Sequence, residues 1–235
     1  MKLADKDIIA RLVTFRDIGI TDNPIKVVKA ISEGNISPKL REALASGKII
    51  IDPMPDIFKV LGSSTIDLQV GVTLEAINIP YEVVNIDGET VIRPFVVDCD
   101  PKHIERIRLH NKYGVTEIDQ SWIRFTIKET DVFELAVGAQ VNAFTQQIVC
   151  IPHDLEGKLD GRSRLARKGI ATHITSDRFD AGFCGFITME IQNSGQCNFN
   201  LRPGFQFCSL GFVQLSGKAE IPYHDKIGAK FSGQH

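Results

Sequence analysis

The chain has 235 residues, of which 43% are hydrophobic and 24% are charged, and its formal net charge is −2. These values are typical of a soluble globular protein, so the composition gives no reason to expect a disordered chain. The near balance of charge gives no reason to expect nucleic acid or a membrane as the main partner, so any strongly basic site has to be local.

The first third of the chain predicts short helices. Asp5 can cap the amphipathic run DKDIIARLV, and a second helix is expected to begin at an Asn-Pro pair near residue 23. In SPKLREALASG, Ser37 suits the N-cap, Pro38 the first helical position and Gly47 the stop.

From residue 48 onward the pattern becomes that of strands. KIIIDPMPD is a strand broken by prolines, and TIDLQVGVTL alternates apolar and polar residues. DPKHIERIRLHNKYG, residues 100–114, has the apolar spacing of a helix. Further short strand-like segments follow up to residue 215, separated by turn signals such as NSG. This density of strands predicts an all-β sandwich, jelly roll or barrel, decorated by N-terminal and inserted helices.

The cysteines and the first residues of the chain indicate in which cellular compartment the protein is expected. Five cysteines are scattered along the chain without a CxxC pair: Cys99, Cys150, Cys184, Cys197 and Cys208. Their number and spacing suggest neither a disulfide framework nor a zinc knuckle, so we expect reduced thiols. MKLADKDI has alternating charges where a signal peptide would have an apolar core, and no apolar run approaches the roughly 18 residues that cross a bilayer. The sequence therefore predicts a cytoplasmic protein.

The segment DGRSRLARKG, residues 160–169, is strongly basic and is called the basic segment below. It places four cationic side chains behind an Asp-Gly turn: Arg162, Arg164, Arg167 and Lys168. If a short helix begins at Ser163, Arg167 lies four residues on over the same face, and guanidinium groups beside free backbone N–H groups suit an anion. A solvated basic helix is the simpler alternative, and the spacing alone leaves both open.

One strand carries a carboxylate in its middle. In GFITMEIQNSG, Ile187, Met189 and Ile191 point to one face, so Glu190 points to the other. Such a carboxylate usually lies on the solvated face of a sheet, and it gains a chemical role only beside a group that needs a base.

The C-terminal segment IPYHDKIGAKFSGQH is interrupted by glycines and holds three polar residues, Tyr223, Lys230 and Gln234. It is either an ordinary frayed terminus or a segment that closes over a ligand.

Together these segments resemble the dCTP deaminases of the dUTPase-like superfamily. The resemblance rests on LEGKLDGRSRLARKG, HITSDRFDAGFCGFITMEIQNSG and LRPGFQFCSLGFVQLSGKAEIPYHDKIGAKFSGQ, in this order, with MKLADKDI, SGKIIIDPMP and GSSTIDLQVG before them. It implies a single domain over residues 1–235 with a distorted jelly-roll or β-barrel fold, and with insertions near 9–41 and 75–130. It also implies a homotrimer whose active sites are shared between subunits.

The implied reaction is the hydrolytic deamination of dCTP to dUTP and ammonia, which supplies the dUMP/dTTP pathway, with Mg²⁺ bound through the triphosphate. No protein-bound zinc is expected. Zinc deaminases need a ligand set of the HxE…PCxxC type, and this chain lacks the paired cysteines.

The resemblance assigns the chemistry to three residues. Glu190 takes the position of the glutamate that activates a water for attack at C4 of cytosine, and it serves as base and then as acid. Ser163 and Arg167 match the residues that hold this carboxylate and the water. A nearby arginine also keeps a carboxylate ionised.

Eight further residues are expected to bind the substrate: Arg162, Arg164, Ser176, Arg178, Asp180, Tyr223, Lys230 and Gln234. Arg162 matches an arginine that reaches the phosphates across the trimer interface, and Asp180 a carboxylate that binds the deoxyribose 3′-hydroxyl. The C-terminal residues among them match those that close over sugar and triphosphate. The basic segment would then help to neutralise about four negative charges on the nucleotide.

Three positions depart from the family's pattern. Arg164 stands where a second serine is usual, and its guanidinium either replaces a hydroxyl contact or faces solvent. Phe183 and Ala181 stand where tryptophan and proline are common. These changes bear on fine substrate preference more than on the reaction.

Three alternatives differ in function. A bifunctional enzyme would deaminate dCTP and also release dUMP and diphosphate, and the sequence does not separate it from a monofunctional deaminase. A plain dUTPase would end in a glycine-rich phosphate-binding segment, whereas this chain ends in AKFSGQH. A trimeric nucleotide-binding protein without turnover is the non-enzyme alternative.

Overall fold

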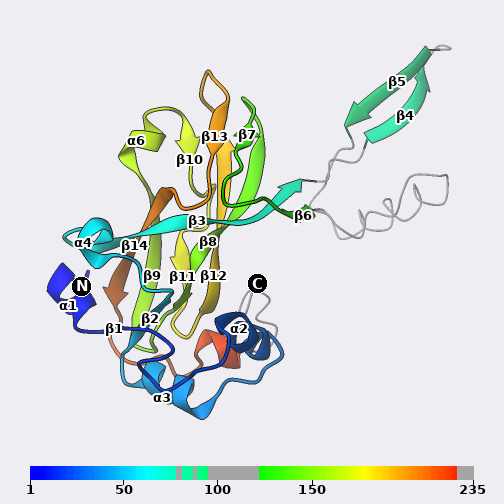
Figure 1. Cartoon of the computed structure of the whole chain (residues 1–235). Helices are drawn as coiled ribbons and strands as arrows, with labels where there is room; N and C mark the ends of the chain where they lie inside the picture. The colour runs from blue at the N-terminus through cyan, green and yellow to red at the C-terminus, as the bar shows by residue number, and fades with distance from the viewer. Residues whose placement is uncertain (78–80, 87–88, 95–121, 227–235) are drawn as a thin grey trace. The chain divides into compact units, whose positions relative to one another are not determined.

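A computed structural model describes residues 1–77, 81–86, 89–94 and 122–226 (Figure 1). The chain divides into two compact units, one of Met1–Leu74 with Thr126–His235 and one of Glu75–Phe125. The helix expected at 100–114 lies outside the described residues. The division into one domain with insertions near 9–41 and 75–130 stays a prediction.

The smaller unit contains an antiparallel hairpin of β4 (Tyr81–Ile86) and β5 (Glu89–Pro94), together with most of β6 (Trp122–Thr126). None of the residues predicted for the site lies in it.

The larger unit is mainly β. Its principal sheet runs in the order β1-β2-β8-β3-β14-β9-β11, with β12 paired to β8 and β10 paired to β12, while β7 and β13 form a separate pair. The strand bounds are β1 (Leu12–Val13), β2 (Ile49–Asp52), β3 (Thr65–Ile77), β7 (Phe133–Leu135), β8 (Gln140–Cys150), β9 (Leu155–Gly161), β10 (Ile170–Ala171), β11 (Arg178–Phe179), β12 (Cys184–Asn193), β13 (Phe199–Leu201) and β14 (Gln206–Gln214). The predicted jelly-roll-like β fold with short helices is confirmed.

The helices are short and begin close to where the sequence predicts. Their bounds are α1 (Asp5–Ile9), α2 (Pro24–Ser32), α3 (Pro38–Ala45), α4 (Ile57–Val60), α6 (Ser163–Ala166) and the 3-10 turn η1 (Tyr223–Asp225). The side chain of Ser37 accepts a hydrogen bond from the N–H of Leu40, which confirms it as the N-cap of α3. Asp5 is the first residue of α1 rather than its cap, because Ala4, with extended backbone angles, is the N-cap.

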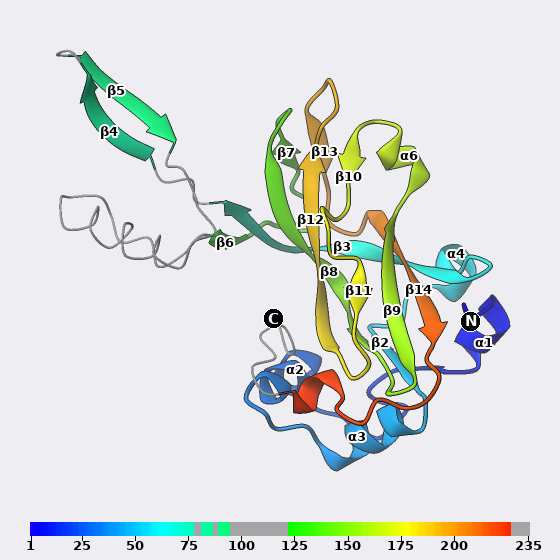
Figure 2. The same cartoon turned by 180° about the vertical axis from the view of Figure 1, so that it is seen from behind.

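A hydrophobic core joins α2 and α3 to one end of β8 and β12, and Figures 1 and 2 show the two helices at that end of the strands. Val28 and Ile31 of α2 and Leu40 and Leu44 of α3 are at most 4% exposed. Burial of one such side chain contributes about 1.5–3 kcal/mol.

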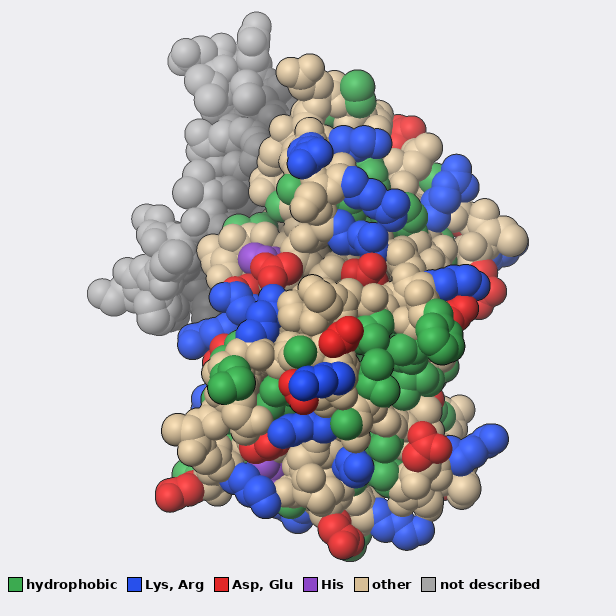
Figure 3. All heavy atoms as spheres, turned by 90° about the vertical axis from the view of Figure 1, so that its left-hand side faces the viewer, with side chains coloured by type: hydrophobic (Ala, Val, Ile, Leu, Met, Phe, Trp, Pro, Cys, Tyr) green, Lys and Arg blue, Asp and Glu red, His purple; other side chains and the backbone are tan. Residues whose placement is uncertain are grey.

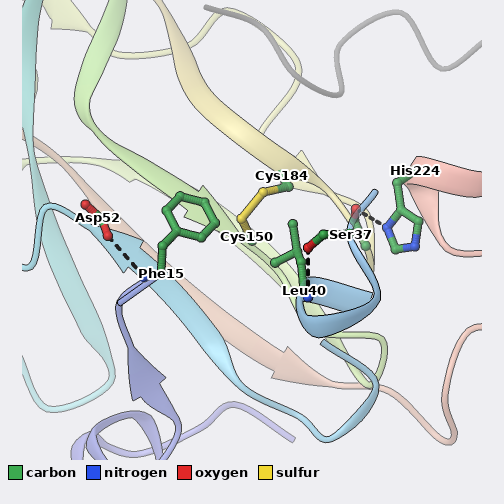
Figure 4. The surroundings of a disulfide bond; sticks show 8 residues. Phe15, Ser37, Leu40, Asp52, Cys150, Cys184 and His224 are labelled. Carbon is green, nitrogen blue, oxygen red and sulfur yellow. Dashed lines mark hydrogen bonds between the residues drawn. A yellow bond between two sulfur atoms is a disulfide. The ribbon is translucent and has the colours of Figure 1, made fainter. Parts of the chain in front are cut away.

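A disulfide between Cys150 and Cys184 lies within this core, beside Phe15 and Leu40 (Figure 4). The prediction of reduced thiols was therefore wrong for these two residues. Antiparallel pairing places Cys150 at the end of β8 opposite Cys184 at the start of β12. The count and spacing of cysteines in a sequence carry no information about such a cross-strand neighbour.

The strand that carries the candidate base follows its predicted alternation. Ile187, Met189 and Ile191 are fully buried, while Glu190 between them is half-buried on the other face. β12 is flanked by β8 on one side and, near its C-terminal end, by β10 on the other.

Candidate active site

Glu190 is half-buried in the middle of β12. Its Oε2 accepts a hydrogen bond of 3.1 Å from the backbone N–H of Ile174, in the segment that follows β10. On β8 the residue directly opposite is Asn142, which is 8% exposed. The carboxylate is therefore held between β8 and the segment after β10.

Buried polar atoms without a partner occur in the residue opposite Glu190 and in the two residues before Ile174. Among the residues that the structure describes, they include Asn142 Oδ1 on β8, and Thr172 Oγ1 and His173 Nδ1 just before Ile174. A buried polar atom without a hydrogen bond costs about 1–3 kcal/mol. Such atoms beside a carboxylate suit a place where water or a polar ligand binds.

Arg162 is held in a polar cluster by side chains of β14, which pairs with β9, and of β3, on the other side of β14. One of its Nη atoms donates to Asp67 Oδ2 on β3 and, at 3.0 Å, to Gln206 Oε1 on β14. The other oxygen of Asp67 accepts from Ser209 Oγ at 2.5 Å. The pairing of β14 with both β3 and β9 brings these residues together, since Ser209 lies opposite both Asp67 and Asp160.

Arg164 contacts an aromatic ring. Its guanidinium carbon lies 4.8 Å from the ring centre of Phe205, next to β14. This cation–π geometry limits the freedom of a long side chain. The guanidinium therefore does not simply extend into solvent.

The cationic side chains of the basic segment other than Arg162 are exposed, that of Arg164 included. The predicted helix start at Ser163 is confirmed, and Arg167 follows the last residue of α6. Ser163, Arg167 and Lys168 are all exposed. Figure 3 shows Lys and Arg side chains gathered over this part of the surface.

A tight crossing ties the basic segment to the end of β12. Gly169 has φ +79°, and a Cβ atom there would lie 2.6 Å from the Cα of Gly195. Ser194 N donates to Gly169 O at 2.8 Å, and Ile170 then pairs with Asn193. The basic segment therefore lies next to the C-terminal end of the strand that carries Glu190. Within the described part of one chain, Glu190 makes no hydrogen bond or ion pair with Ser163 or Arg167.

Asp180 and Tyr223 line a common pocket of about 410 Å³. Glu156 and Lys226, which the sequence analysis did not single out, line it too. Tyr223 N donates to Ala181 O at 2.7 Å, which fixes η1 beside Asp180.

This pocket is far from Glu190 and from Arg162 within one chain. Cys184 begins β12 shortly after Asp180, whereas Glu190 lies six positions further along the strand, roughly 20 Å at about 3.3 Å per residue. Glu156 lies near the start of β9, and Arg162 directly follows its end. A single chain therefore does not bring all the predicted residues together.

Four other residues were also predicted to bind the substrate. Ser176 is exposed on the segment between β10 and β11, and Arg178, the exposed first residue of β11, lies opposite Lys158 of β9. Lys230 and Gln234 lie outside the described residues.

The segment before Lys230 is anchored to the main body. His224 Nδ1 donates to Gly182 O at 2.9 Å, and Arg41 binds both carboxylate oxygens of Asp225 at 2.6 and 2.8 Å. The rings of His153 and His224 lie 5.2 Å apart. Burial lowers the pKa of His153 below its ordinary value, and His224, Arg41 and Lys218 lower it further, while Asp225 opposes them.

We expect this anchor to make stability depend on pH. Because the folded state holds the pKa of His153 down, the unfolded chain takes up the proton first, so stability present above about pH 6.5 is lost as the pH falls below it. His153→Gln should therefore show a smaller fall in Tm between pH 7.5 and 5.5 than the wild type. An equal fall in both proteins would contradict this role of His153.

No group of three or more His, Cys, Asp or Glu side chains in the described part of the chain is placed to hold a metal ion. Burial raises the pKa of the Cys208 thiol to about 12, so it is not a nucleophile at neutral pH. Of the helices described, none has the length and apolar character needed to cross a membrane.

Comparisons with known proteins agree with the sequence pattern. The family model described as "dCTP deaminase-like" matches residues 36–215. A "dCTP deaminase, dUMP-forming" from Dictyoglomus thermophilum is 31% identical over 195 residues, which cover 83% of this chain and 87% of that protein. A dCTP deaminase from Tolumonas auensis is 32% identical over 198 residues, which cover 83% of this chain and 91% of that protein. The crystal structure of a dCTP deaminase from Agrobacterium tumefaciens aligns with 70% of this chain and 41% of that one, at 13% identity and a TM-score of 0.45.

Proposed function

The chain belongs to the dCTP deaminase-like family, and from this premise we propose that it hydrolyses dCTP to dUTP and ammonia. The observation that carries the proposal is the position of Glu190. It is half-buried in mid-strand, its Oε2 accepts from the N–H of Ile174, and it lies opposite Asn142, whose buried Oδ1 has no partner among the described residues. This is the environment that a general base acting on a bound water needs.

The proposed mechanism uses one carboxylate twice. Glu190 takes a proton from water while the oxygen attacks C4 of cytosine and the ring electrons move to N3. The carboxyl group passes this proton to N3, then takes the proton of the new C4–OH group and passes it to the departing amine, so that ammonia leaves as C4=O forms. The chemistry requires no zinc, and Mg²⁺ enters with the triphosphate of the substrate.

Arg162 and Arg164 are proposed to bind the triphosphate. Asp67 and Gln206 orient the first guanidinium, and the ring of Phe205 orients the second. Guanidinium groups suit phosphate oxygens because they offer paired donors in one plane.

The distances along β9 and β12 support an active site shared between subunits. One chain separates the pocket of Asp180 and Tyr223 from both Glu190 and Arg162. A homotrimer could bring the pocket of one subunit to the basic segment or the carboxylate of another, and we propose this assembly. Ser163 and Arg167, which are exposed, would act on the Glu190 of a neighbouring subunit.

We expect Arg162→Ala to raise KM for dCTP about 10- to 100-fold with a smaller change in kcat, since a charge-assisted hydrogen bond contributes about 1.5–3 kcal/mol. Steady-state ammonia release measures both constants. Arg16→Ala, at an exposed arginine remote in sequence from these segments, is the control and should keep the wild-type KM. An unchanged KM in Arg162→Ala would remove this residue from the phosphate site.

The test of the function is incubation with dCTP and Mg²⁺, followed by an ammonia assay and chromatographic separation of dUTP from dUMP. The proposal predicts ammonia and dUTP in equal amounts. Ammonia with dUMP and diphosphate would favour the bifunctional reaction, which the name of the Dictyoglomus relative keeps as a second candidate. Nucleotide binding without ammonia would contradict both and favour a non-catalytic protein.

A further inference from the structure

We propose that Asn142 is a further catalytic residue, which holds the attacking water together with Glu190. This inference rests on the proposed function and adds a second protein contact to the nucleophile.

The first argument is the register of β8 and β12. Asn142 and Glu190 are directly paired across the two antiparallel strands. Residues in such a pair lie on the same face of the sheet with Cβ atoms about 4.5–5.5 Å apart. The amide and the carboxylate are therefore close neighbours on one face.

The second argument is an acceptor that lacks a donor. Asn142 is 8% exposed, and its Oδ1 has no hydrogen-bond partner among the described residues. An ionised Glu190 offers only acceptors. The backbone N–H of Ile174 already donates to Glu190. A water molecule bound beside the two side chains would supply the donor that Oδ1 lacks within one chain.

Water fits this position because it has two O–H donors for two acceptors. With one hydrogen directed to Glu190 and the other to Asn142 Oδ1, its lone pairs are turned toward a third direction, where C4 of the pyrimidine would lie. Glu190 then takes one proton as the O–C4 bond forms and the electrons of the C4=N3 bond move to N3. Asn142 Oδ1 accepts from the new hydroxyl group while N3 is protonated, and this contact ends when Glu190 takes the hydroxyl proton and passes it to the departing amine as C4=O forms.

The test compares Asn142→Leu, which keeps the approximate size and removes the acceptor, with Gln140→Leu. Gln140 lies two residues before Asn142 on β8, is paired with Gln192 and is half-buried, so it is a matched control on the same face. We expect Asn142→Leu to lower kcat for dCTP about 10- to 100-fold, with KM within about twofold of the wild type. Gln140→Leu should keep both constants. If Asn142→Leu does not fold, Asn142→Ala replaces it.

Two further measurements separate a catalytic from a structural role. The dissociation constant of dCTP, measured by calorimetry in a Glu190→Gln background, should be unchanged by Asn142→Leu. Asn142→Asp keeps an acceptor but places a second carboxylate beside Glu190, which disfavours ionisation of the pair. In the Asn142→Asp variant, the acidic limb of the kcat–pH profile should therefore move to higher pH.

The results that would refute the role of Asn142 differ from the results that would refute the proposed function. A wild type that releases no ammonia would refute the function itself. An active wild type with an equally active Asn142→Leu variant would refute the role of Asn142 alone. A rise in KM and in the dissociation constant without a fall in kcat would indicate that Asn142 binds the pyrimidine ring. This result would also refute the contact of Asn142 with the attacking water.

Discussion

Glu190→Gln is expected to lower kcat for dCTP deamination by about 10²–10⁴-fold while dCTP still binds. The amide of glutamine has nearly the shape of the carboxylate and keeps an oxygen that can accept from the N–H of Ile174. It cannot take a proton from water. Ammonia release measures the loss of turnover, and calorimetry with dCTP measures the binding that remains.

A matched control for this variant is Glu134→Gln. Glu134 is an exposed glutamate in the middle of β7 and accepts a hydrogen bond from Asn198 Nδ2 at 2.9 Å. Its replacement should leave kcat and KM unchanged. If Glu190→Gln loses dCTP binding and Tm along with turnover, Glu190 is a structural residue rather than the base.

Truncation after Lys226 is expected to remove most activity, about 100-fold or more in kcat/KM, and to leave a folded protein. The cut removes Lys230 and Gln234, which are proposed to close over the sugar and triphosphate, and a missing lid exposes the reaction to water. It spares the contacts that anchor η1, namely His224 with Gly182 and Asp225 with Arg41. Steady-state kinetics and a thermal melt measure the two effects.

A cut after Pro222 is the informative comparison. It also removes His224 and Asp225, so it should lower Tm as well as activity. The point variants Lys230→Ala and Gln234→Ala should each raise KM without changing Tm. Full turnover by the protein that ends at Lys226 would show that the C-terminal residues do not take part.

Features that depend on neighbouring residues in the chain could be predicted from the sequence. The N-cap at Ser37, the helix start at Ser163 and the alternation around Glu190 all follow from side-chain chemistry or from the period of a strand. The cap at Asp5 was wrong by one residue, since the end of a helix is set by small differences in backbone angles.

Features that depend on strand register could not be predicted. Asp67 and Arg162 are 95 residues apart and meet only because β3, β14 and β9 are neighbours in the sheet. The ring of Phe205 under Arg164 and the pairing of Asn142 with Glu190 have the same origin. The motif GSSTIDLQVG contains Asp67, but nothing in a single sequence shows which cation a carboxylate will face.

The measurement that tests the central claim most directly is ammonia release from dCTP by protein whose zinc content has been determined after dialysis against a chelator, with Mg²⁺ in excess. If a carboxylate activates the water, turnover should persist with far less than one zinc ion per chain. Activity that falls in proportion to the zinc removed, and returns when zinc is added, would contradict the account.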